Sequence, residues 1–74
     1  MKLPLVSSDN VLKILSKKGF VVVRQRGSHI CLHKKIENKN YLVVVPKKKE
    51  IKRGTLISIL KQAGMDRKEF LEML

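Results

Sequence analysis

The sequence is poor in the residues on which several kinds of site depend. Of its 74 residues only one is cysteine, two are histidine and six are acidic, and tryptophan is absent. The lone Cys31 has no partner for an internal disulfide, and one cysteine with two histidines is too few for a four-ligand zinc site. The scattered carboxylates do not favour a Mg²⁺ site either. The sequence therefore predicts no metal and no cofactor, and Cys31 is interpreted as a small buried hydrophobic residue.

Long apolar runs are also missing. The longest uncharged ones, residues 20–23 and 41–45, are far shorter than the ~20 residues that span a bilayer. The first residues lack the apolar stretch of a secretory signal. We therefore expect a cytoplasmic protein with no membrane contact. A chain of this length has room for one small domain, which we predict over residues 1–74.

Positive charge is what the sequence has in excess. Seventeen Lys and Arg against six Asp and Glu give a formal charge of +11 at pH 7. A run of basic residues is commonly no more than a solvated loop. Here, however, the acidic residues are too few to pair with the basic ones, so a polyanionic partner is the leading expectation. Aromatic residues are scarce, and binding of single strands by base stacking has little support.

The spacing of apolar residues predicts two main helices and a short third one. The first covers about residues 9–18, after a cluster of cap-forming residues, and stops at Gly19. The second starts near Arg53, with apolar residues recurring at helical spacing, and stops at Gly64. Asp66 is expected to cap a final short helix.

Three apolar segments between the helices are typical of strands: residues 20–23, 29–33 and 41–45. The polar segments between them, residues 24–28 and 35–40, are predicted to form a turn and a hairpin loop. Consecutive strands with short connections make an antiparallel sheet, the only surface on which two amphipathic helices can bury their apolar sides. The predicted fold class is α+β, a two-layer α-β-β-β-α arrangement with the helices on one face of a three-stranded antiparallel sheet.

Alternation along the second strand assigns its faces. Ile30 and Leu32 share one face, which we expect under the helices, so His29 and His33 lie on the other, the open face. Residues 21–23 are all valine and cannot all point inward, so the open face should be partly apolar. Such a face favours a covering partner or a homodimer. The alternative is that Lys and Arg stems and the terminal helix cover it.

Three motifs follow one another along the chain: Gly27-Ser28-His29 after the first strand, Val45-Pro46 at the end of the third, and GTLISILKQAG over residues 54–64. In this order and spacing they resemble the HicA toxin family, small mRNA interferases of bacterial and archaeal toxin–antitoxin pairs. The resemblance covers nearly the whole chain. It implies a fold like that of double-stranded-RNA-binding domains, cleavage of mRNA, and a HicB-type antitoxin that blocks the active face. An acidic antitoxin would suit the charge of +11.

The resemblance also implies that His29 is catalytic, and the chemistry agrees. RNA carries its own nucleophile, the ribose hydroxyl, so an enzyme needs no metal but a proton acceptor, a proton donor and positive charge around the phosphate. Histidine serves in either proton-transfer role near neutral pH. The alternative is a structural surface histidine. His33, four residues along the same face and roughly 13 Å away, is expected to be structural or to contact RNA.

The remaining candidates supply charge and a close backbone approach to phosphate. The expected phosphate-binding set is Arg24, Arg26, Gly27, Ser28, Lys47, Lys48, Lys49, Lys52 and Arg53. Some members of the family carry a histidine shortly after the strand-three proline, where this chain has lysines. The second proton-transfer group therefore stays open between a lysine, water and a histidine of a second subunit. Thr55 and Ser58 are interpreted as capping or surface hydroxyls.

The functional hypothesis is a metal-independent endoribonuclease toxin. Its alternatives are a non-catalytic RNA-binding module and, with less support, an interaction protein that uses the apolar sheet face.

Overall fold

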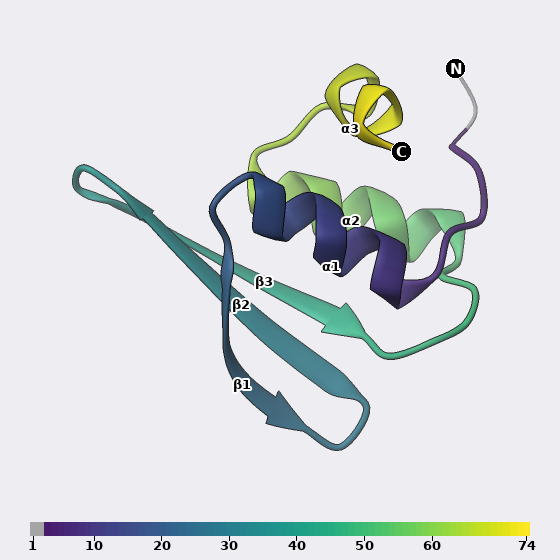
Figure 1. Ribbon diagram of the computed structural model, residues 1–74, viewed down its shortest axis with the longest axis horizontal. Helices are drawn as coiled ribbons and strands as arrows, with labels where there is room; N and C mark the ends of the chain where they lie inside the picture. Colours follow the sequence, from purple (N-terminus) through teal and green to yellow (C-terminus); the bar gives the residue numbers. More distant parts are fainter. Residues whose placement is uncertain (1–2) are drawn as a thin grey trace.

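The computed structural model describes residues 3–74, and Met1 and Lys2 of the predicted domain lie outside the described residues. Its elements are α1 (Ser8–Lys17), β1 (Val21–Arg26), β2 (His29–Ile36), β3 (Lys39–Pro46), α2 (Arg53–Ala63) and α3 (Arg67–Met73), all shown in Figure 1. The strands form one antiparallel sheet in the order β1-β2-β3. The predicted element order and the α+β fold class are confirmed.

The helices begin and end where the local signals predict, to within a residue. Ser7 and Asn10 form a capping box, because the side chain of each accepts a hydrogen bond from the backbone N–H of the other. Gly19 follows α1 at a φ of +97°, and Gly64 ends α2 at a φ of +67°. The carboxylate of Asp66 caps α3, as predicted.

The strands differ from the prediction, because they are longer at their polar ends. Phe20 was expected to begin the first strand but lies before it, buried in the core. Residues 24–26, predicted as a turn, belong to β1, and the predicted loop over residues 35–40 reduces to the turn residues Glu37 and Asn38. Antiparallel pairing runs to both two-residue turns because it satisfies the backbone whatever the side chains are. These polar residues are exposed or half-buried, so apolar alternation is not needed there.

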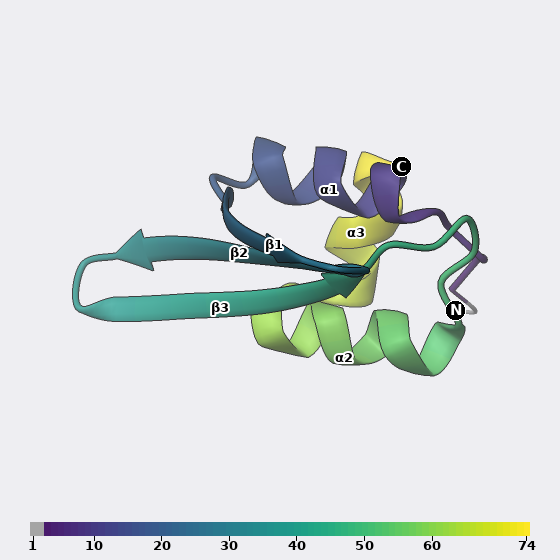
Figure 2. The same ribbon diagram turned by 90° about the horizontal axis from the view of Figure 1, so that it is seen from below.

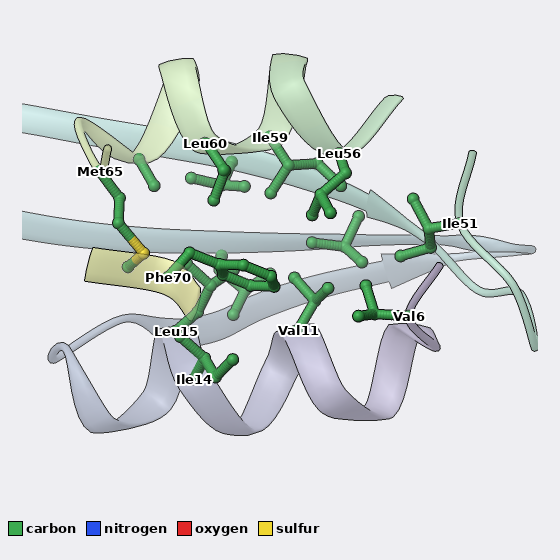
Figure 3. Close-up of a cluster of buried hydrophobic side chains, with 14 of the residues drawn as sticks. Val6, Val11, Ile14, Leu15, Ile51, Leu56, Ile59, Leu60, Met65 and Phe70 are labelled. Atoms are coloured by element: carbon green, nitrogen blue, oxygen red, sulfur yellow. The ribbon is translucent and has the colours of Figure 1, made fainter. Parts of the chain in front are cut away.

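All three helices lie on one side of the sheet. α1 and α2 lie side by side against it, and α3 lies over the seam between them on the side away from the strands (Figures 1 and 2). Figure 3 shows Phe70 of α3 reaching into the core between α1 and α2, where it is 1% exposed. The alternative that the terminal helix covers the open face is therefore wrong. No helix within residues 3–74 is long and apolar enough to cross a membrane.

The open face of the sheet is partly apolar, as predicted. Ile30 and Leu32 are buried under the helices, whereas Val21 of β1, opposite His33 on the open face, is 63% exposed. On β3, Leu42 is 60% exposed. Cys31 is half-buried rather than buried, because it points to the face that no helix covers.

Candidate active site

His29 occupies the first position of β2, directly after the two-residue turn Gly27-Ser28. Gly27 has a φ of +59°, the conformation that a tight hairpin turn requires at its first central position and that glycine adopts without strain. The turn leaves His29 exposed at the end of the hairpin. The imidazole is thus accessible and carried by a rigid strand rather than by a loop.

Two arginines of β1 share the face on which His29 lies. Arg26 pairs directly with His29, and Arg24 pairs with Cys31. Residues directly opposite one another in an antiparallel pair point to the same side of the sheet. A bulge after Val22 shifts the register so that both arginines fall on this face. Strand β1 therefore orients the guanidinium groups of Arg24 and Arg26, two residues that were predicted to lie in a turn.

The lysine run after β3 is fixed by main-chain contacts. The Lys47 N–H donates to the carbonyl oxygen of Ser28 at 2.6 Å, which ties the run to the turn before His29. The Lys48 N–H donates to Ser8 Oγ at 3.2 Å, and the Lys48 carbonyl accepts from the Ser8 N–H at 2.9 Å. This segment is therefore held between the hairpin turn and the start of α1, unlike a freely solvated loop.

A groove of about 550 Å³ lies between the end of the sheet that carries His29 and helix α2. Six polar residues line it: Ser28, His29, Lys48, Thr55, Ser58 and Gln62. This His29 groove combines an imidazole, an ammonium group, hydroxyls and an amide within one concave surface. Such a set can hold a phosphate and ribose hydroxyls while a proton is transferred.

The α2 wall of the His29 groove was not recognised from the sequence. Thr55 and Ser58 are exposed hydroxyls, as interpreted, but they share the groove with His29. Gln62 was missed altogether. The signal was present, since polar residues at positions i, i+3 and i+7 lie on one face of a helix. Gln62 Oε1 accepts the Val44 N–H at 3.0 Å, which fixes this face of α2 to the edge of β3.

The other predicted phosphate ligands lie outside the His29 groove. Lys47 and Lys49 line a neighbouring hollow beside the start of α1. Lys52 and Arg53 lie at the start of α2, and Arg53 Nε donates to the carbonyl oxygen of Leu3 at 2.6 Å. The structure thus gathers Ser28, His29 and Lys48 and leaves these four basic residues around them.

His33 lies farther along β2, with its Nε2 3.2 Å from Asn40 Oδ1. This contact agrees with a structural role. Within residues 3–74, no group of three or more His, Cys, Asp or Glu residues is placed to hold a metal ion.

The comparisons with known proteins name a family for this fold and site. No curated protein matches the chain. A family model described as the HicA toxin of bacterial toxin–antitoxin systems matches residues 8–65, well over half of the chain. The match runs from α1 to the residue after the Gly64 stop, so it includes the whole sheet and every residue that lines the His29 groove. The members of this family are RNases and act together with an antitoxin. The chain therefore belongs to the HicA toxin family of toxin–antitoxin systems.

Proposed function

We propose that the protein is a metal-independent endoribonuclease toxin that cleaves mRNA, with His29 as the proton-transfer residue. The observation that carries the proposal is the exposed imidazole of His29 in a groove that also holds hydroxyl, amide and lysine side chains, beside the apolar residues Val44, Pro46 and Ile59. Arg24 and Arg26 add positive charge on the same face. A chain with a charge of +11 attracts RNA over the whole of this surface.

The proposed reaction uses the ribose of the substrate as the nucleophile. The His29 imidazole takes the proton of the 2′-hydroxyl, the bond between O2′ and phosphorus forms, and the bond between phosphorus and O5′ breaks. The departing O5′ takes a proton from water, and the imidazolium returns its proton to solvent. The products are a 2′,3′-cyclic phosphate and a free 5′-hydroxyl. No external nucleophile is needed, so the protein supplies proton transfer and positive charge.

We propose that an acidic HicB-type antitoxin covers the open face and blocks the His29 groove in the cytoplasm. The exposed side chains of Val21 and Leu42 would lose contact with water on binding, which is favourable. The charge of +11 would meet opposite charge on the antitoxin. Two copies of this chain would instead bring like charges together, so the surface favours an acidic partner over a homodimer.

The test is degradation of an unstructured RNA by the purified protein in EDTA, with wild type compared with His29→Ala. We expect His29→Ala to abolish cleavage and to retain RNA binding that weakens with salt. His33→Ala is the matched control, since it removes the same kind of side chain from the same face and should keep most of the cleavage.

Three results would contradict the proposal. Binding without cleavage by either protein would indicate a non-catalytic RNA-binding module. Cleavage unaffected by His29→Ala would remove His29 from the mechanism. Loss of cleavage when EDTA is added would show that a metal takes part.

A further inference from the structure

Three consecutive lysines, 47–49, are chemically identical, but the structure places them differently. Of the lysines within residues 3–74, Lys48 is the one that lines the His29 groove. All three lysines line the neighbouring hollow beside α1, and Lys48 alone of the three also lines the His29 groove. A run that looks like general electrostatic attraction in the sequence therefore contains one lysine at the reaction site.

The main chain of Lys48 is also held more firmly than a surface loop requires. The Lys48 N–H donates to Ser8 Oγ, and the Lys48 carbonyl oxygen accepts from the hydroxyl and the N–H of Ser8. Ser8 is 4% exposed, and it is the one buried polar side chain among the described residues. A buried hydroxyl that bonds to another segment fixes the position of that segment, because leaving the bonds unmade costs free energy. The fold thus fixes the main chain of Lys48 at the edge of the His29 groove before any substrate binds.

We propose that Lys48 is the second catalytic residue of the site, an inference that rests on the ribonuclease function proposed above. Its ammonium group contacts a non-bridging oxygen of the scissile phosphate and stabilises the negative charge that accumulates in the pentacovalent transition state. A positioned cation stabilises this charge without reorganisation during the reaction. Lys47 and Lys49 attract RNA but do not touch the reacting phosphate.

The experiment compares alanine variants of the three lysines under single-turnover conditions. Lys48→Ala is expected to lower the cleavage rate at saturating protein by about 100- to 1,000-fold, the range found for loss of one positioned charge-stabilising donor. Lys47→Ala and Lys49→Ala should weaken RNA binding while keeping the saturated rate within a few fold of wild type. Lys48→Arg keeps a positive charge that can bond to phosphate and should recover much of the lost rate.

Lys68→Ala is the control for total charge, since Lys68 is exposed on α3, on the side of the helices away from the sheet. It should match wild type in rate and differ little in affinity. The variants replace exposed side chains, and thermal unfolding will verify that each one folds.

The outcomes separate this inference from the ribonuclease function. If wild type cleaves and His29→Ala does not, but Lys48→Ala changes only the affinity, as Lys47→Ala and Lys49→Ala do, the role of Lys48 is refuted while the ribonuclease stands. A Lys48→Arg variant as inactive as Lys48→Ala would also refute a role based on charge. If wild type does not cleave at all, both proposals fail.

Discussion

Arg26 and His29 lie directly opposite one another across the Gly27-Ser28 turn, as the last residue of β1 and the first residue of β2. The pairing places a guanidinium group and an imidazole side by side on the open face, at the end of the hairpin. A phosphate held by Arg26 would lie beside His29. The tightness of the turn, rather than any contact between the two side chains, creates this arrangement.

RNA binding should weaken steeply with salt, and Arg26 should account for part of that dependence. Each phosphate contact to a single strand contributes a slope of about −0.7 to the plot of log K against log salt. We expect Arg26→Ala to reduce the slope by about one such contact, measured by fluorescence anisotropy with a labelled RNA. Lys68→Ala is the charge-matched control. Equal slopes for Arg26→Ala and wild type would show that Arg26 does not contact phosphate.

Gly27 should be required for stability and for cleavage. Its φ of +59° is strained for any residue with a Cβ, although a Cβ built there meets no atom within 4 Å. We therefore expect Gly27→Ala to lower the free energy of unfolding by about 1 kcal/mol from backbone strain alone, and to slow cleavage by displacing His29. Urea unfolding measures the first effect. Gly54→Ala is the comparison, because Gly54 lies in α2 with equally open space and no positive φ, and alanine should stabilise the helix there.

Leu42 should contribute to antitoxin binding. The side chain is 60% exposed on the open face, opposite His33. Burial of a leucine side chain is worth about 1.5–3 kcal/mol, so Leu42→Ser should weaken antitoxin binding about tenfold or more, measured by calorimetry. Ile36→Ser is the matched control, since Ile36 is also exposed but lies at the far end of the hairpin on the other face. Equal losses for both variants would argue against docking on the open face.

Phe70 should be essential for folding. It is 1% exposed and comes from α3, beyond the residues that match the family model. Removing a buried phenylalanine costs about 3–5 kcal/mol, and a domain of 74 residues is stable by only about 4–11 kcal/mol. Phe70→Ala should therefore be close to unfolded at 37 °C, by circular dichroism. Leu74→Ala, at a residue that is 52% exposed, should change the stability little. A folded Phe70→Ala with an unchanged melting temperature would show that α3 is dispensable.

The boundaries of the helices could be predicted because their signals are local. Gly19, Gly64 and Asp66 act through bonds and dihedral angles within a few residues, and each lies where the prediction put it. The cap of α1 is Ser7, one member of the predicted cap-forming cluster, and α1 begins one residue earlier than predicted. The ends of the strands could not be predicted from local signals, because a strand extends as far as the neighbouring strand offers backbone groups for hydrogen bonding. Apart from Ile36, residues 24–26 and 35–40 are polar and show no apolar alternation, yet pairing between strands includes most of them.

By itself the sequence determined the element order, the inward face of β2 and the exposure of His29, since periodicity and local capping decide them. The tertiary structure alone decided which lysine of 47–49 enters the His29 groove, that Thr55, Ser58 and Gln62 form its far wall, and that α3 packs behind the other helices. These features depend on contacts between segments distant in the chain, such as those of Ser8 with Lys48 and of Gln62 with Val44. No local pattern of residue types encodes which distant segments meet.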